Sequence, residues 1–269
     1  MNEPMDSHAV ELRYGVATDV GLVREVNEDS LLAAPPVFVV ADGMGGHDGG
    51  EIASRIVVEE FAGLAHAGFD RADGTQAVLA TLESCRRRLR EYAAGHRGSD
   101  GGPWLGGTTA VVALLVDEDA GPAWLLANLG DSRIYRFTGS ELVRVSTDHS
   151  VVQELVDAGQ ITEEQSLVHP ERHIVTRALG GPDPLDPDFF SWALTDAERI
   201  LLCSDGVTDL VRDHRLADLL RDNPDPRDAA DQVVATALAA GGIDNATAVV
   251  VDVVGLTEDR TEQNLGALP

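Results

Sequence analysis

The stretch Val37-Phe38-Val39-Val40-Ala41-Asp42-Gly43-Met44 joins a run of five apolar residues directly to an Asp-Gly pair. Such a short apolar run predicts a buried strand. The chain repeats the design at Ile200–Cys203, which is followed by Ser204-Asp205-Gly206. A carboxylate at a strand end is fixed in direction, and the glycine after it lets other groups approach the backbone closely. The two stretches therefore predict two strands that each present a fixed carboxylate.

Three further acidic motifs are spread along the chain: NEDS at 27–30, GDSR at 130–133 and DN at 244–245, with Asp209 four residues after Asp205. Several carboxylates that converge on one place repel one another unless cations neutralise them. Oxygen-rich sites of this kind suit Mg²⁺ or Mn²⁺. The pattern predicts a metal-dependent hydrolase.

Length and composition fit one domain of 269 residues, of which 43% are hydrophobic, enough to bury a full core. We expect a catalytic domain over residues 12–254, between a flexible N-terminus (1–11) and an acidic flexible tail (255–269). The N-terminus lacks the basic start and apolar centre of a signal peptide, and no apolar stretch approaches the roughly 20 residues that cross a bilayer. The two cysteines, Cys85 and Cys203, are too few for a disulfide framework, which favours the cytoplasm.

The formal net charge of −26 limits the partners of this chain. Such a surface repels nucleic-acid phosphates and anionic lipids, so we expect neither nucleic acid nor membrane as a ligand. It also repels phosphorylated proteins at long range, so a phosphate site must depend on local cations.

The apolar patterns predict an α+β protein with nine strands, two long helices and a further helix before the last strand. Residues 108–146 are expected to form an antiparallel meander, which 189–192 and 200–203 continue and 247–254 closes. Many antiparallel strands with grouped helices favour a four-layer α-β-β-α sandwich of two packed sheets between helices. The expected strands are 12–18, 37–41, 108–116, 123–128, 134–137, 142–146, 189–192, 200–203 and 247–254, and the helices are 49–65, 75–94 and 228–239.

The segment 147–186 is far longer than an ordinary connection between strands. It holds a short amphipathic pattern at 151–156, a stop at Gly159 and the cations Arg172, His173 and Arg177. Two interpretations stand side by side: a structural excursion that covers a sheet edge, or a mobile flap whose cations attract a phosphorylated partner.

The order of these motifs resembles that of the metal-dependent protein phosphatases, or protein phosphatase 2C family, and most closely its bacterial Ser/Thr phosphatases. A single Asp-Gly is weak evidence, but six motifs in the family's order are specific. The resemblance covers about residues 12–254 and implies a β-sandwich flanked by helices, with two metals at one edge between the sheets. The motifs are REVNED at 24–29, DGMGGH at 42–47, GTT at 107–109, GDSR at 130–133, SDG at 204–206 and DN at 244–245.

The resemblance also implies roles for single residues. Asp42 resembles the carboxylate that bridges two core Mn²⁺ or Mg²⁺ ions, with the Gly43 carbonyl as a further ligand. Asp205 and Asp244 resemble the other ligands of the second core metal, and Glu28 the residue that reaches the metal shell through water. The arginine that grips the substrate phosphate corresponds to Arg24, whose forked donors suit two oxygens. Asp131 and Asp209 resemble ligands of a third, weaker metal that shares Asp205.

An isolated Asp is more often a turn former or a helix cap, and this is the interpretation preferred for Asp29 and Asp48. Asp29 is expected to orient a neighbour through hydrogen bonds. His47 is more often a histidine at a helix start than a catalytic acid.

The implied reaction is hydrolysis of phosphoserine and phosphothreonine by a hydroxide that bridges the two metals, opposing bacterial Ser/Thr kinases. The expected partners are therefore Ser/Thr kinases and their phosphorylated substrates. One departure concerns the proton donor. Many eukaryotic members carry a histidine where this chain has Met44, so a metal-bound water, His47 or a flap residue remains a candidate general acid.

Three alternatives remain. A partner-switching phosphatase of the same superfamily usually carries a sensor domain, and none fits in this length. A catalytically dead phosphopeptide-binding module is expected to have lost a ligand, yet Asp42, Asp205 and Asp244 are all present. An unrelated two-metal nuclease is disfavoured by the charge of −26.

Overall fold

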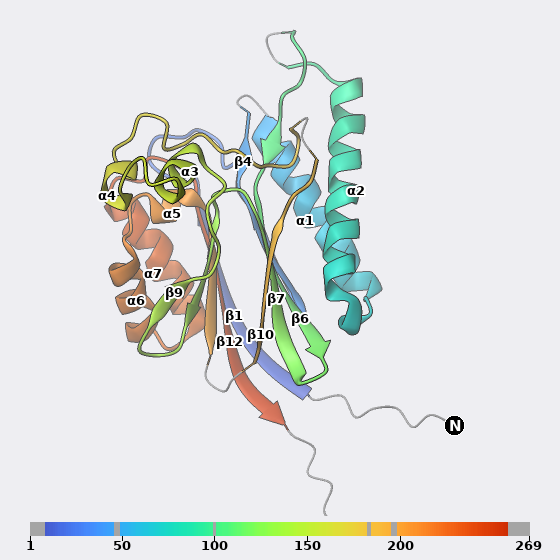
Figure 1. Ribbon diagram of the computed structural model, residues 1–269, viewed down its shortest axis with the longest axis vertical. Helices are drawn as coiled ribbons and strands as arrows, with labels where there is room; N and C mark the ends of the chain where they lie inside the picture. The colour runs from blue at the N-terminus through green and yellow to red at the C-terminus, as the bar shows by residue number, and fades with distance from the viewer. Residues whose placement is uncertain (1–8, 46–48, 99–100, 182–183, 195–197, 258–269) are drawn as a thin grey trace, which may run out of the picture.

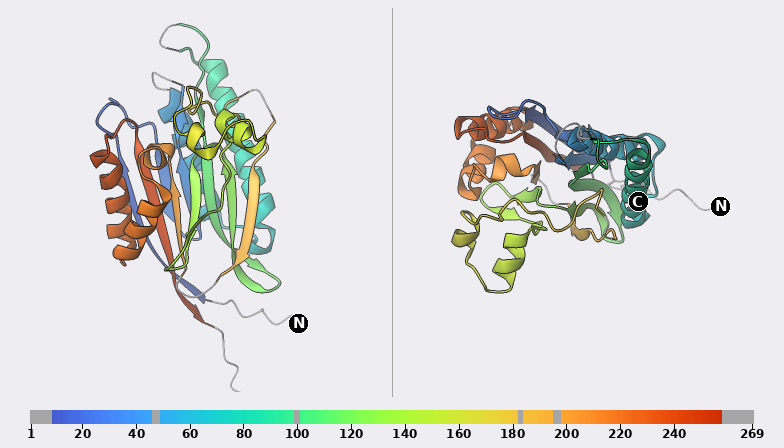
Figure 2. Two further views of the ribbon diagram at one scale, coloured as in Figure 1. Left: turned by 60° about the vertical axis from the view of Figure 1, so that its left-hand side comes forward. Right: turned by 90° about the horizontal axis from the view of Figure 1, so that it is seen from above.

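The structure, a computed structural model, describes residues 9–45, 49–98, 101–181, 184–194 and 198–257. Ten of its strands form two five-stranded antiparallel sheets, which pack face to face with helices outside them (Figures 1 and 2). The predicted α+β sandwich of four layers is confirmed. The ends expected to be flexible lie for the most part outside the described residues.

The first sheet has the order β1-β12-β11-β8-β9 and the second the order β10-β7-β6-β3-β2. A short pair, β4 and β5, follows β3 and precedes β6. The strands are β1 (Ala9–Asp19), β2 (Ser30–Ala34), β3 (Val37–Ala41), β4 (Gly43–Met44), β5 (Gly107–Thr108), β6 (Ala110–Glu118), β7 (Gly121–Leu129), β8 (Arg133–Phe137), β9 (Leu142–Arg144), β10 (Asp188–Ala193), β11 (Arg199–Cys203) and β12 (Ala246–Thr257).

The predicted continuous meander is wrong, because its strands divide between the two sheets. β6, β7 and β10 belong to the second sheet, whereas β8, β9, β11 and β12 belong to the first. The chain changes sheets in the turn at Gly130, whose φ is +120° and where a Cβ would lie 2.5 Å from Thr109 Cγ2. A side chain at Gly130 would clash there, so the crossing depends on this glycine.

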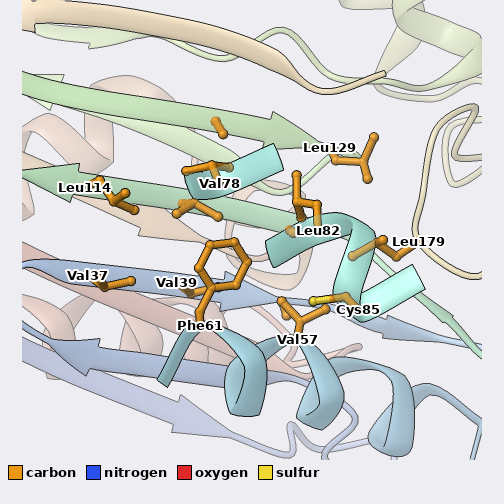
Figure 3. Close-up of a cluster of buried hydrophobic side chains, with 14 of the residues drawn as sticks. Val37, Val39, Val57, Phe61, Val78, Leu82, Cys85, Leu114, Leu129 and Leu179 are labelled. Atoms are coloured by element: carbon orange, nitrogen blue, oxygen red, sulfur yellow. The ribbon is translucent and has the colours of Figure 1, made fainter. Parts of the chain in front are cut away.

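Strand alternation with a period of two builds three hydrophobic layers. In β3, Val37, Val39 and Ala41 face helices, whereas Phe38 and Val40 enter the space between the sheets. The outer layer of the second sheet packs under α1 (Gly49–Ala67) and α2 (Gly74–Gly95), as Figure 3 shows. Because a one-residue slip would turn each strand over, this alternation fixes the register.

The outer face of the first sheet is covered by α6 (Asp213–Asp222) and α7 (Pro226–Ala239), the orange-red helices in Figure 2. The sequence pattern does not predict α6, because its apolar positions, Leu216, Leu219 and Leu220, fill little more than one turn among charged residues. The strand β2 was also missed, since its short apolar run merges with β3 across Pro35-Pro36.

The segment 147–186 carries α3 (Val151–Asp157) and α4 (Glu163–Ser166) in its described part. Ser150 caps α3, and Thr162 and Gln165 form a capping box on α4. The segment returns to the sandwich through Leu179, whose backbone exchanges two 2.9 Å hydrogen bonds with Thr108. In Figure 1 it lies beside α5 (Asp205–Thr208), at the end of the sandwich where β4 is labelled.

Across the described ranges, no helix combines the length and the apolar character needed to cross a membrane.

Candidate active site

The predicted site residues lie together at the end of the sandwich where β3 and β11 finish. They line a cavity of about 450 Å³. The residues of its wall that the sequence analysis had singled out as ligands or phosphate contacts are Arg24, Glu28, Asp42, Gly43, Asp131, Asp205, Asp209 and Asp244.

Asp42 is held by the strand end on which it sits. Its N–H donates to Thr109 Oγ1 at 3.0 Å, and its carbonyl accepts from Thr108 Oγ1 and from the Thr109 N–H at 2.9 Å each. A Cβ on Gly43 would lie 2.3 Å from the Gly50 carbonyl oxygen and 2.4 Å from that of Glu28. Only glycine allows this close approach, which explains the Asp-Gly pair.

Asp205 opens α5, and Asp209 follows as its C-cap, with its N–H donating to the Asp205 carbonyl at 2.8 Å. The four-residue spacing therefore covers one helical turn, as predicted. His173 of the long segment joins them: its Nδ1 lies 3.4 Å from Asp209 Oδ2. Ligand atoms of His173, Asp205 and Asp209 all lie within 4.8 Å of one another.

Burial and the convergence of the carboxylates raise their pKa values. Burial, followed by the nearby carboxylates of Asp29, Asp205 and Asp131, raises the pKa of Asp42 well above its ordinary value. Burial and then Asp209 raise the pKa of Asp205 to about 6, and burial is the first cause that raises the pKa of Asp29 to about 7. Burial and mutual repulsion favour the uncharged form of each carboxyl group, and a cation bound among them would oppose this effect.

Arg24 lies at the rim of the cavity, where its Nη2 donates to Asp244 Oδ2 at 2.7 Å. The loop that carries Arg24 is tied down by the buried side chain of Asn245. The Nδ2 of Asn245 donates to the carbonyls of Val20 (2.9 Å) and Val26 (3.0 Å), and its Oδ1 accepts from the Glu28 N–H (2.8 Å). Asn245, the residue after Asp244, therefore ties the Arg24 loop to the segment that carries Asp244.

Two acidic residues of the NEDS motif have different surroundings. Glu28 lines the cavity and its carbonyl accepts from Ser54 Oγ at 2.6 Å. Asp29 accepts at 2.8 Å from the hydroxyl of Ser204, the residue before Asp205. This contact matches the expectation that Asp29 orients a neighbour through a hydrogen bond.

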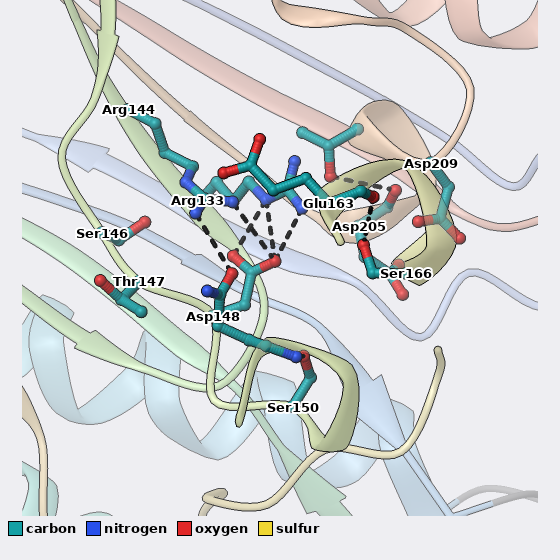
Figure 4. A network of polar contacts seen from close by, with 12 residues as sticks. Arg133, Arg144, Ser146, Thr147, Asp148, Ser150, Glu163, Ser166, Asp205 and Asp209 are labelled. Atoms are coloured by element: carbon teal, nitrogen blue, oxygen red, sulfur yellow. Dashed lines mark hydrogen bonds and ion pairs between the residues drawn. The ribbon is translucent and has the colours of Figure 1, made fainter. Parts of the chain in front are cut away.

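Asp131 lies in the turn after β7 and is 8% exposed. It also lines a second cavity of about 440 Å³, which continues under α3 and α4. In that cavity Arg133 pairs with Asp148, with Nη2 to Oδ2 at 2.7 Å, as Figure 4 shows. Burial and the nearby carboxylates of Asp205, Asp148 and Asp209 raise the pKa of Asp131 well above its ordinary value.

The donor set suits hard divalent cations. Six carboxylates and the Gly43 backbone line one cavity. Among the described residues of its wall, Arg24 carries a positive charge and His173 an ionisable imidazole. Mg²⁺ and Mn²⁺ prefer oxygen ligands of this kind. The residues present therefore fit a divalent metal centre.

Comparisons with known proteins agree with this geometry. The family model described as "Protein phosphatase 2C" matches residues 24–240. The serine/threonine protein phosphatase PstP of Mycobacterium tuberculosis is 37% identical over 251 residues, which cover 93% of this chain and 47% of PstP. Protein phosphatase PhpP of Streptococcus pneumoniae is 32% identical, over 93% of this chain and 100% of PhpP. A crystal structure of the PstP catalytic domain in complex with two manganese ions superimposes with a TM-score of 0.76 at 35% identity, covering 92% of this chain and 100% of that one.

The chain therefore belongs to the protein phosphatase 2C family of metal-dependent phosphatases. Within the family its relatives are bacterial serine/threonine phosphatases. The chain spans about half the length of PstP.

Two features of the site escaped the sequence analysis. The bonds of Asn245 and Thr109 became visible only when distant segments met, although both residues lie inside quoted motifs. His173 was singled out only as a flap cation, and it faces the cavity. Met44 also lines the cavity, while His47 and Asp48 lie outside the described residues.

Proposed function

We propose that this chain is a metal-dependent serine/threonine protein phosphatase that hydrolyses phosphoserine and phosphothreonine in proteins. The observation that carries the proposal is the single cavity in which six carboxylates and Gly43 face one arginine. Two core Mn²⁺ or Mg²⁺ ions and a third, weaker one are the proposed cofactors. Family membership and the manganese-bound PstP domain support the metal requirement.

The proposed ligand roles follow the family resemblance, and the shared cavity supports them. Asp42 and Asp205 line the same cavity, and the Asp205 carboxylate helps to raise the pKa of Asp42; Asp42 would hold both core ions with help from the Gly43 carbonyl. Asp205 and Asp244 would hold the second ion, and Glu28 would reach its shell through water. Asp131 and Asp209 would hold the third ion together with Asp205.

Arg24 is the proposed phosphate ligand. Only its Nη2 bonds Asp244 in the structure, and a guanidinium has five N–H donors. Donors therefore remain for two phosphate oxygens, and the Asp244 contact holds the fork at the rim of the cavity. This arrangement positions a phosphate against the carboxylate cluster.

When bound, the metals supply Lewis-acid chemistry, in which the pKa of water falls towards neutrality and phosphate charge is neutralised. The chain's own part is to orient and to stabilise. Thr108 and Thr109 fix the Asp42 backbone, and Arg24 stabilises the oxygens of the phosphoryl group as it transfers. Among the candidate general acids, a flap residue is supported by His173, which lines the cavity.

The proposed partners are phosphorylated proteins, including Ser/Thr kinases and their substrates. We further propose a catalytic domain over residues 12–254 with the segment 147–186 as its flap, supported by the place of that segment beside the cavities. A cytoplasmic location is proposed because Cys85 and Cys203 are both buried and unpaired, and burial raises the pKa of each thiol to about 12.

The test is phosphate release from a phosphothreonine peptide with Mn²⁺, with Mg²⁺ and with chelator, for the wild-type chain and for Asp42→Asn. We expect metal-dependent release that Asp42→Asn abolishes. Peptide binding without release would favour a dead binding module, and cleavage of nucleic acid would favour a nuclease.

A further inference from the structure

An exposed apolar surface surrounds Arg24. Leu22, Val23 and Val26 are 70%, 66% and 49% exposed, and Ile243, which precedes Asp244, is 43% exposed. Single exposed apolar residues are ordinary, but here four of the twelve large ones found among the described residues occupy two touching loops. We call Leu22, Val23, Val26 and Ile243 the apolar rim.

The two loops of the rim are in direct contact. The Leu22 N–H donates to the Gly242 carbonyl at 2.7 Å. A Cβ on Gly242 would lie 3.0 Å from Leu22 Cγ, and a Cβ on Gly21 would lie 2.3 Å from the Asp244 carbonyl oxygen. The glycines thus let the loops close on each other, which places Leu22 beside the residue that precedes Ile243.

The backbone of the rim is already fixed. Asn245 accepts from one backbone N–H of the Arg24 loop and donates to two of its carbonyls. Gly21 and Gly242 both have positive φ, +81° and +50°. Apolar side chains on a fixed backbone lose little freedom when they are covered, so they contribute more to binding than side chains on a floppy loop.

We propose that the apolar rim binds apolar side chains next to the phosphorylated residue of the protein substrate, and so favours substrates with such neighbours. This inference rests on the proposed function. Val23 adjoins Arg24 in the chain, and Ile243 lines the cavity itself. Two residues of an extended peptide span about 7 Å, so the residues beside a phosphate held by Arg24 lie within reach of the rim.

Two arguments favour the substrate over another occupant. A partner that stayed on the rim would cover Arg24 and close the cavity, whereas a substrate leaves after each turnover. The net charge of −26 repels acidic phosphoproteins at long range, and apolar contact is a source of affinity that this repulsion does not oppose. The preference is therefore expected to persist at high salt, where charge effects are screened.

The experiment compares two phosphothreonine peptides that differ only in the two residues on each side of the phosphothreonine, leucine in one and serine in the other. Both are assayed with Mn²⁺ on the wild-type chain, Leu22→Ser, Val23→Ser and the control Val143→Ser. Val143 is 44% exposed on β9, the edge strand at the far side of the first sheet from β1. 4-Nitrophenyl phosphate, which has no flanking residues, reports the chemistry alone.

We expect the wild-type chain and Val143→Ser to prefer the leucine peptide by roughly 5- to 20-fold in kcat/KM, the size expected for burying part of one or two apolar side chains. Leu22→Ser and Val23→Ser should lose most of that preference, while turnover of 4-nitrophenyl phosphate stays within about twofold. The coupling between the rim and the peptide is the diagnostic quantity.

Equal preference in the wild-type chain and the rim variants would overturn the proposal, as would a dimer in solution that Leu22→Ser dissociates. If the wild-type chain turned over none of the substrates, including 4-nitrophenyl phosphate, this result would instead contradict the proposed phosphatase function.

Discussion

The two ends of β11 differ in how their buried charges are compensated: one end holds a paired arginine, and the other leads into crowded carboxylates. At its start, Arg199 pairs across the ladder with Asp252, through Nε to Oδ1 at 2.6 Å and Nη2 to Oδ2 at 2.8 Å. The same guanidinium also donates to the carbonyls of Leu220, Asn223 and Pro224. All five donors of this buried arginine are therefore used. Just beyond the other end, Asp205 faces Asp42 and Asp209 and has a raised pKa of about 6.

The difference separates a structural charge from a functional one. A buried ion with every hydrogen bond satisfied ties its surroundings together, because breaking it would leave an uncompensated charge. Carboxylates that crowd together repel one another and so lower the stability of the fold locally, and such an arrangement marks a functional site. The comparison predicts opposite outcomes when the two ends are substituted.

The largest expected effect is on activity at the carboxylate end. Asp42→Asn should lower turnover of a phosphothreonine peptide by about a thousandfold or more, which corresponds to about 4 kcal/mol. Because it removes one of several repelling carboxylates, the metal-free variant should melt at a temperature equal to or above that of the wild-type chain. Parallel measurement of phosphate release and of thermal unfolding in chelator checks both. Near-wild-type turnover would end the two-metal interpretation.

The paired end should show the reverse. Arg199→Ala leaves Asp252 and three carbonyls without their donor, and we expect a loss of about 3–5 kcal/mol in the free energy of unfolding. Turnover per folded molecule should stay close to that of the wild-type chain. The exposed Arg227, which pairs with Asp225, is the matched control, and Arg227→Ala should leave denaturant unfolding unchanged. Equal midpoints for the two variants would contradict the structural role of Arg199.

Substitution of Arg24 tests its proposed role as the ligand of the substrate phosphate. Removing a charged hydrogen-bonding group from a phosphate should weaken substrate binding by about 1.5–3 kcal/mol, so Arg24→Ala should chiefly raise KM. Arg24→Lys should recover only part of the loss, because an ammonium group lacks the fork. Steady-state kinetics of the three proteins decide this, and full recovery by lysine would show that charge alone matters.

Many of the strands and site residues could be predicted from the sequence. The apolar run before Asp42 and the one before Asp205 gave both strands and the fixed carboxylates, because strand periodicity and Asp-Gly are local signals. The assignment of strands to sheets could not be predicted in the same way, since the exchange at Gly130 depends on its contact with Thr109. The role of Asn245 was hidden for a similar reason, as its partners lie more than 200 residues away in the chain.

The smallest expected effect concerns the third ion. Asp131 comes from the turn after β7 and Asp209 from the end of α5, and both line the same cavity as Asp42. Neither residue is assigned to the core pair, so Asp131→Ala and Asp209→Ala should each keep two bound metals and lose about tenfold in turnover, or about 1.4 kcal/mol.

The double variant distinguishes a shared site from two separate contributions. If both aspartates hold one ion, either substitution already empties the site, and the second should add little to the loss. Metal content by native mass spectrometry, measured beside phosphopeptide turnover, gives both readouts for the three variants. Loss of all bound metal in Asp131→Ala would place that residue in the core centre. Multiplication of the two losses would mean that the aspartates act independently, and unchanged turnover would make the third ion irrelevant to catalysis.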